Sequence, residues 1–71
     1  MEITKGDPIV VDGHKYRVRG GGVDLGYLAI ALAPARNPTH SVHFDVPPVW
    51  DGRAGVWRVN GRLGIHPSRL P

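Results

Sequence analysis

Seventy-one residues are enough for one hydrophobic core, so we expect a single domain spanning residues 1–71. The chain contains no cysteine, which excludes disulfide bonds and thiolate metal sites. Nine Lys and Arg against six Asp and Glu give a formal net charge of +3, an excess that fits an ordinary soluble domain as well as a nucleic-acid-binding one.

Neither export nor membrane insertion is expected. The N-terminus lacks a basic start followed by an apolar run, and the longest apolar run, Tyr27 to Ala35, is too short to cross a bilayer. We therefore expect a cytoplasmic protein with no membrane partner. A domain this small, without a disulfide, must be stabilised by a small, well-packed core or by self-association. We therefore consider a homodimer as well as a monomer.

The predicted elements are all strands, because ten Gly and seven Pro leave no window for three regular helical turns. Asp12-Gly13 is a strong two-residue hairpin signal between Ile9-Val10-Val11 and a strand from His14 to Val18. This turn pairs Val11 with His14 and Ile9 with Tyr16. One face then carries Ile9, Val11, His14, Tyr16 and Val18 and is predicted to be core, and the other carries Val10, Lys15, Arg17 and Arg19.

The middle of the chain is predicted to hold two more strands. Residues 19–26, which include Gly20-Gly21-Gly22, are expected to form a flexible loop. In the Ala-rich segment Leu25 to Arg36, leucine and isoleucine alternate with alanine, which is the period of a strand. Pro34 to Thr39 is then a turn. The strand that follows, Ser41 to Val46, would point Val42, Phe44 and Val46 inward and Ser41, His43 and Asp45 outward.

The last part of the chain is predicted to be a stiff connection followed by a hairpin. Residues 47–52 contain two prolines that cannot donate to a sheet ladder. Asn60-Gly61 indicates a turn, and a three-residue loop over residues 60–62 is the register that unites Trp57, Val59, Leu63 and Ile65 on one face. Five or six short strands of this kind predict an all-β fold, either a small barrel or a sandwich.

The segment from Gly55 to Leu70, GVWRVNGRLGIHPSRL, resembles the C-terminal third of a Src-homology-3 domain. It contains a tryptophan strand, a glycine-bearing turn, a buried strand, and Pro67-Ser68 opening a short 3₁₀ turn. The opening Lys5-Gly6-Asp7 ahead of an apolar strand is similar to the first strand of many small barrels of this type. The resemblance implies a five- to six-stranded Src-homology-3-like barrel.

The resemblance does not extend to the peptide groove of that family. Val56 stands where the first ligand-stacking aromatic is expected, and Leu70 replaces the aromatic expected shortly after Pro-Ser. Of the groove residues only Pro67 matches. The resemblance therefore implies the fold and argues against the binding of proline-rich peptides, since a fold alone does not fix a function.

Two features are candidate binding sites, a basic strand face and Trp50. Lys15, Arg17 and Arg19 lie along one strand face, with Arg58 on the outer face of another, and this arrangement can follow a phosphate backbone. Tyr27 or Trp50 would then be the stacking platform. The alternative is a solvated strand face.

Trp50 lies in the proline-rich connection and is a candidate anchor for a partner, because tryptophan is enriched at binding hot spots. The alternative is that Trp50 caps an open end of the barrel. Trp57 is expected in the core.

No catalytic or metal site is predicted. His43 and Asp45 share a strand face and can ligate a metal, but we interpret them as part of a polar outer face. No Ser or Thr has a recognisable base beside it, and Gly20-Gly21-Gly22 lacks the ending of a phosphate-binding loop. We therefore expect a protein that is not an enzyme and holds no cofactor or metal.

The leading hypothesis is a protein-binding module, of the kind that a phage or another accessory factor uses to dock on a host protein. Its partner-binding residues would be Trp50, Tyr27 and Pro67. The alternative hypothesis is a nucleic-acid-binding barrel that uses Lys15, Arg17, Arg19 and Arg58. An enzyme would require an oligomer that assembles a site from several chains at its centre.

Overall fold

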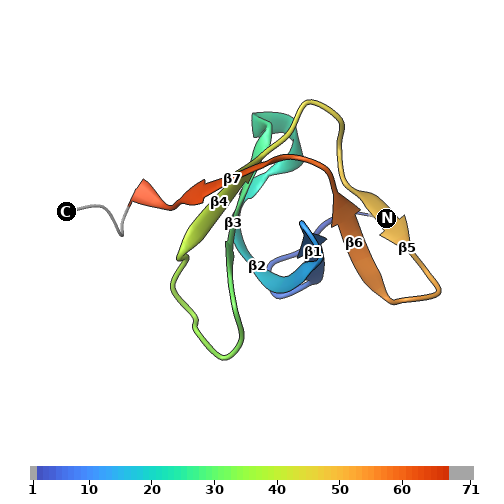
Figure 1. Cartoon of the computed structure of the whole chain (residues 1–71), viewed down its shortest axis with the longest axis horizontal. Helices are drawn as coiled ribbons and strands as arrows, with labels where there is room; N and C mark the ends of the chain where they lie inside the picture. The colour runs from blue at the N-terminus through green and yellow to red at the C-terminus, as the bar shows by residue number, and fades with distance from the viewer. Residues whose placement is uncertain (1, 68–71) are drawn as a thin grey trace.

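The chain is built from short strands and one 3₁₀ turn in the computed structural model, which describes residues 2–67 (Figure 1). In chain order the elements are β1 (Pro8–Val11), β2 (His14–Gly22), η1 (Val23–Leu25), β3 (Tyr27–Ala31), β4 (His40–His43), β5 (Val49–Asp51), β6 (Val56–Val59) and β7 (Arg62–Ile65). The described part of the chain contains no α-helix, which confirms the all-β prediction.

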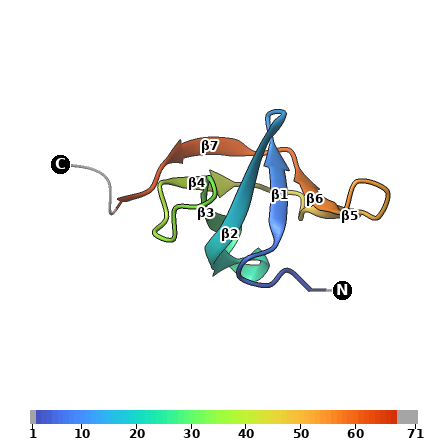
Figure 2. The same ribbon diagram turned by 90° about the horizontal axis from the view of Figure 1, so that it is seen from below.

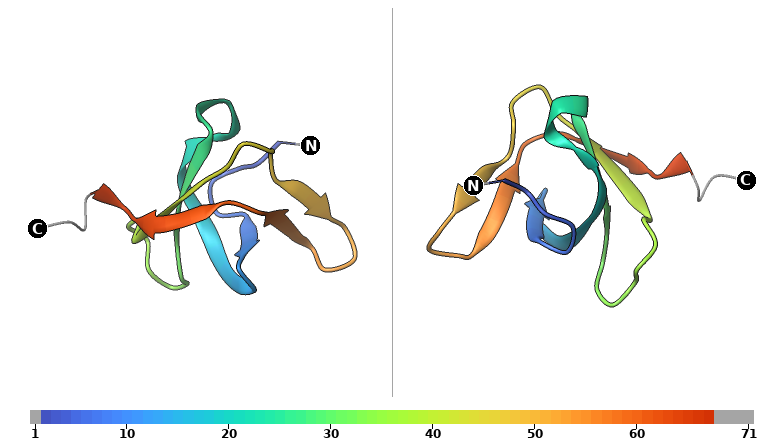
Figure 3. Two further views of the ribbon diagram at one scale, coloured as in Figure 1. Left: turned by 45° about the horizontal axis from the view of Figure 1, so that its top comes forward. Right: turned by 180° about the vertical axis from the view of Figure 1, so that it is seen from behind.

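All seven strands belong to one mixed sheet, with the order β5-β6-β1-β2-β3-β4-β7. The β1–β6 pair is parallel, and every other neighbouring pair is antiparallel. The sheet curls strongly, as Figures 2 and 3 show, but its edge strands β5 and β7 are not paired with each other in the described residues. The observed architecture is therefore a curled seven-stranded sheet that is not closed.

The first hairpin confirms the predicted register. Ile9 pairs with Tyr16 and Val11 with His14 across the turn at Asp12-Gly13. Asp12 and Gly13 both have positive φ, 50° and 78°, as expected for a tight turn whose twist matches its strands. The predicted core face is buried at Ile9, Val11, Tyr16 and Val18, whereas His14 beside the turn is exposed.

Residues 19–26 differ from the predicted loop, because β2 continues through all three glycines to Gly22. The β2–β3 ladder shifts register between Val18 and Gly20, which places a bulge at Arg19. Gly21 has φ +78°, and a Cβ there would lie 2.6 Å from the carbonyl oxygen of Tyr27. The glycines thus allow two backbones to approach closely.

The two middle strands are shorter than predicted. Leu28 and Ile30 are buried, but Leu32 lies beyond the end of β3 and is 55% exposed. Phe44 is buried although it follows the end of β4, whereas Val46 is 68% exposed, which contradicts its predicted inward position. Ser41, predicted to face outward into water, is buried on the outer face between Ala29 and Gly64.

The predicted hairpin at Asn60-Gly61 is wrong. β6 pairs with β1 and β5, and β7 pairs with β4, so the chain crosses from one side of the sheet to the other between Val59 and Arg62. Figure 1 shows β6 leading into β7 without a reversal. Gly61 lies against β4 at this crossing, since a Cβ added there would collide with the carbonyl oxygen of His43. The connection predicted over residues 47–52 instead contains β5, which forms a hairpin with β6.

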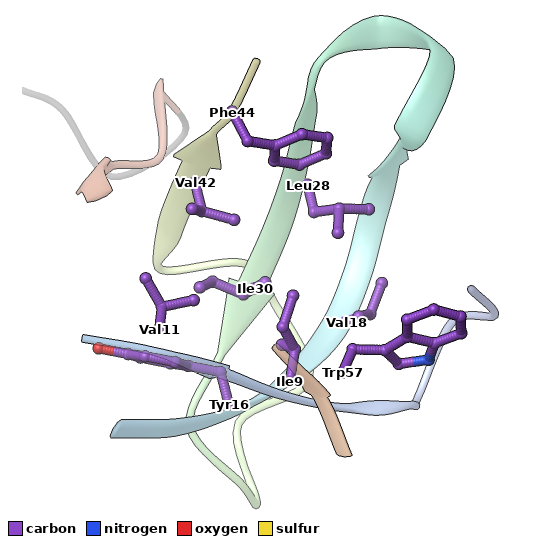
Figure 4. Close-up of a cluster of buried hydrophobic side chains, with 9 residues drawn as sticks. All are labelled: Ile9, Val11, Tyr16, Val18, Leu28, Ile30, Val42, Phe44 and Trp57. Atoms are coloured by element: carbon purple, nitrogen blue, oxygen red, sulfur yellow. The ribbon is translucent and has the colours of Figure 1, made fainter. Parts of the chain in front are cut away.

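The core fills the concave side of the curled sheet. Nine buried side chains from five strands and the segment after β4 point into it (Figure 4): Ile9, Val11, Tyr16, Val18, Leu28, Ile30, Val42, Phe44 and Trp57. The indole Nε1 of Trp57 donates a hydrogen bond to Asp7 Oδ2 at 3.2 Å, which satisfies its polar atom beside the core. Within the described residues no buried side-chain nitrogen or oxygen lacks a hydrogen-bond partner.

None of the described segments is a helix with the length and apolar character needed to cross a membrane.

Candidate binding surfaces

Residues 46–50, which lead into β5 and include its first two residues, are the most apolar exposed segment of the described chain. Three of its side chains are exposed, Val46 at 68%, Val49 at 66% and Trp50 at 37%. The two prolines between them fix the backbone and remove two donors, and Pro48 is itself buried. We call residues 46–50 the Val46–Trp50 ridge.

Trp50 lies opposite Trp57 in the β5–β6 ladder, and the two rings meet edge to face with centroids 5.3 Å apart. Contacts of this geometry are favourable between aromatic rings. Trp50 therefore covers the edge of the core beside Trp57 while a large part of its own ring stays in contact with solvent. The position of Trp50 fits both roles predicted from the sequence, a cap on an open end of the barrel and an anchor for a partner.

A groove of about 630 Å³ lies on one side of the ridge. Its walls come from the N-terminal segment, η1, the two prolines and β6, and they consist of Glu2, Ile3, Gly22, Val23, Asp24, Pro47, Pro48 and Trp57. The carboxylates of Glu2 and Asp24 have no hydrogen-bond or ion-pair partner in the described part of the chain. We call this the Trp57 groove; its walls are mainly apolar, and the charged groups that line it in the described residues are acidic.

A shallower groove of about 270 Å³ lies on the other side of the ridge. It is lined by Val46, Pro47, Val49, Arg58, Val59 and Asn60. Pro47 lines both grooves, so the ridge forms a wall that they share.

Arg58 holds the hairpin beside the ridge together. Its Nε donates to Asp51 Oδ2 at 2.8 Å, and the backbone N–H groups of Arg53 and Ala54 donate to the other carboxylate oxygen. The hydrogen bond from Arg58, followed by that from Ala54, lowers the pKa of Asp51 below its ordinary value of 3.8. Arg58 is therefore engaged within its own hairpin.

The other predicted nucleic-acid-binding residues are only partly brought together. Lys15 and Arg58 lie on either side of Val10 in one row across β2, β1 and β6. Arg17 donates to the carbonyl oxygen of Gly6 at 3.3 Å, and Arg19 donates to that of Ala35 at 3.1 Å. Among these four basic residues, Lys15 makes no hydrogen bond or ion pair in the described structure.

The three predicted partner-binding residues lie on different elements. Trp50 is on the edge strand β5, Tyr27 begins β3, and Pro67 is exposed after β7. Tyr27 stacks on His43 rather than on Trp50, with ring centroids 5.5 Å apart and an interplanar angle of 27°. Sequence reasoning thus proposed Trp50 as a binding residue but did not propose the exposed valines beside it.

The histidines do not form a cluster with the acidic residues, and no group of three or more His, Asp or Glu side chains in the described residues could hold a metal ion. His40 lies inside the sheet near Tyr16 and shares a 2.9 Å hydrogen bond with the Thr39 hydroxyl. The sequence signal for the ridge was the pair of valines on either side of Pro47-Pro48; strand alternation predicted Val46 to face inward, and it is exposed.

The chain matches no family model, no curated protein and no solved structure. The two grooves offer aromatic and aliphatic carbon, backbone groups and, in the Trp57 groove, carboxylates. Groups of these kinds can hold a ligand through complementary shape, burial of apolar surface and charge.

Proposed function

We propose that this protein is a non-enzymatic protein-binding module and that its partner binds over the Val46–Trp50 ridge. We further propose that the curled sheet is a small Src-homology-3-like barrel, on the strength of its short strands, the strong curl of the sheet and the all-β fold. The observation that carries the binding proposal is the ridge itself. Three large apolar side chains remain in water within five residues, on a rigid segment between two grooves.

Burial explains why such a ridge favours a protein partner. Covering an exposed valine is worth about 1.5 kcal/mol or more, and exposed apolar patches on small soluble domains mark interaction sites. The prolines keep the ridge rigid, so little conformational entropy is lost when a partner binds. Trp50 supplies the large aromatic contact that binding hot spots commonly contain.

The Trp57 groove indicates the charge of the partner. Among the described residues the carboxylates of Glu2 and Asp24 have no partner, and they lie beside apolar walls, although the chain as a whole is basic. A partner segment that places a Lys or Arg there would gain charge-assisted contacts with the carboxylates and lay its aliphatic stem on the exposed Val23.

The proposal is tested by selecting binders from a displayed library of random peptides and measuring their affinities. We expect the selected peptides to combine apolar residues with Lys or Arg and to shift the indole N–H resonances of Trp50 and Trp57. Val46→Ser and Val49→Ser should each weaken binding about tenfold, from about 1.5 kcal/mol of lost burial. Asp24→Asn should weaken the binding of the cationic peptides.

Two variants serve as matched controls. Leu32→Ser removes a side chain of similar exposure in the β3–β4 connection, away from the ridge, and Asp12→Asn removes a carboxylate at the first hairpin turn. Both should leave peptide affinity unchanged. Peptides that bind the wild type and the Val46→Ser and Val49→Ser variants equally well would count against the proposal, as would a library that gives no binder.

A further inference from the structure

A second surface lies on the outer face of β3, β4 and β7 and does not involve the ridge. The sheet register places Tyr27, His43 and Arg62 directly beside one another in a single row across these strands. Residues paired in this way project from the same face of a sheet. The hairpin predicted from the sequence would have kept Arg62 away from His43, so only the observed crossing assembles this row.

The row presents stacked rings next to a cation. Tyr27 is half-buried and His43 is exposed, and their rings stack at 5.5 Å and 27°. Arg62 is exposed at the position that follows His43 across the ladder. None of the three side chains has a hydrogen-bond or ion-pair partner among the described residues, so their polar groups are free for a ligand.

The adjacent row on the same face carries small side chains. It consists of Gly20, Ala29, Ser41 and Gly64, which lie side by side across β2, β3, β4 and β7. Same-face rows in a sheet are about 7 Å apart. A flat group stacked on His43 would therefore meet no long side chain from that row.

The charges around this face favour an anionic ligand. Arg17 and Lys15 project from the outer face of β2, which adjoins β3, and Arg19 lies at the bulge. The acidic side chains near the row are Asp45, two residues after His43, and Asp24, whose Oδ1 lies 2.7 Å from the position of a Cβ on Gly22, the residue paired with Tyr27. A ligand suited to the row combines a flat ring with a negative charge.

We propose that Tyr27, His43 and Arg62 form a platform that binds single-stranded nucleic acid. A base stacks on the face of the His43 ring that is turned away from Tyr27, and Arg62, on the next strand, pairs with a backbone phosphate. Base stacking on aromatic rings together with phosphate contacts is how proteins bind single strands with little sequence preference. An anionic peptide is the competing occupant, and the test below separates the two.

The test measures the affinity of a labelled oligothymidylate of about twelve nucleotides by fluorescence anisotropy at low salt. His43→Ala should raise the Kd about 5- to 150-fold, the range expected for one lost base-stacking contact, and His43→Phe should restore the affinity. Arg62→Gln should raise the Kd and reduce the slope of log Kd against log salt concentration by about one. Asp45→Asn should lower the Kd.

Two controls make the outcome decisive. Arg53→Gln removes an exposed arginine from the β5–β6 turn, outside the row, and should leave the Kd unchanged. An abasic oligomer of the same length and charge should bind at least about fivefold more weakly than oligothymidylate if a base stacks on His43. Equal affinity for the abasic oligomer or for polyglutamate would overturn the proposal, as would an equal loss from Arg53→Gln and Arg62→Gln. A failure here would leave peptide binding at the ridge intact, because the two surfaces share no residue.

Discussion

Ile30→Ala is expected to lower the free energy of unfolding by about 3 kcal/mol, within the range of about 2–5 kcal/mol measured for such truncations. Ile30 is completely buried in the middle of β3, and its loss would leave a cavity among residues from both halves of the sheet. A chain of this length has a total stability of roughly 4–10 kcal/mol, so the loss is a large share of it. Urea denaturation followed by tryptophan fluorescence measures the change.

Leu32→Ala is the matched control for this prediction. Leu32 continues the same alternation by two residues, and the sequence alone places it inward like Ile30. It is 55% exposed in the structure, so its truncation should change the stability by about 0.5 kcal/mol or less. Similar losses from the two variants would show that β3 extends further than Ala31.

Gly61→Ala is expected to lower the stability by about 3 kcal/mol, at the upper end of the cost of inserting a methyl group where there is no space. The added Cβ would collide with the carbonyl oxygen of His43 and come within 3.1 Å of the Val42 side chain. Because a β4 backbone carbonyl cannot move freely, β7 would have to shift away from β4. The thermal unfolding midpoint and the urea midpoint should both fall.

Gly64→Ala tests whether this loss is specific to the crossing. Gly64 lies three residues further along β7, and a Cβ added there meets no atom within 4 Å. We expect no loss of stability, and a small gain if the alanine reduces the freedom of the unfolded chain. If Gly64→Ala were as damaging as Gly61→Ala, the close approach of Gly61 to β4 would not be the cause.

The sequence was informative wherever neighbouring residues determine the structure. Asp12-Gly13 requires positive φ and joins two strands of clear alternation, so both the register and the buried face of the first hairpin could be derived. The same applies to Leu28, Ile30 and Val42, whose burial follows from strand periodicity. Local turn chemistry and period are enough in these cases.

The sequence misled where long-range pairing outweighs a local signal. Asn60-Gly61 has the composition of a hairpin turn, but Gly61 is required there because β4 passes close to it, not because the chain reverses. Ser41 is buried on the outer face although strand alternation points it away from the core, and it lies between Ala29 and Gly64 on the neighbouring strands. Neither fact can be derived from residues adjacent in sequence.

The candidate sites also divide into what local sequence indicates and what depends on long-range pairing. Trp50 in its proline-rich segment could be proposed as a binding residue from composition and rigidity alone. The Trp57 groove brings together segments around Glu2, Asp24, Pro48 and Trp57, which are far apart in the chain. The row of Tyr27, His43 and Arg62 likewise depends on strand order, so neither surface could be assembled without the topology.

The crossing between β6 and β7 is the claim on which both proposed surfaces depend. The β1–β6 pairing before the crossing holds Trp57 in the groove beside the ridge, and the β4–β7 pairing after it places Arg62 beside His43. The most direct test is a nuclear Overhauser measurement of backbone proton contacts between strands. The structure predicts contacts between Ser41 and Gly64 and between Val10 and Arg58. Contacts between Val59 and Leu63 in their place would show a local hairpin and would contradict the topology, the groove and the row together.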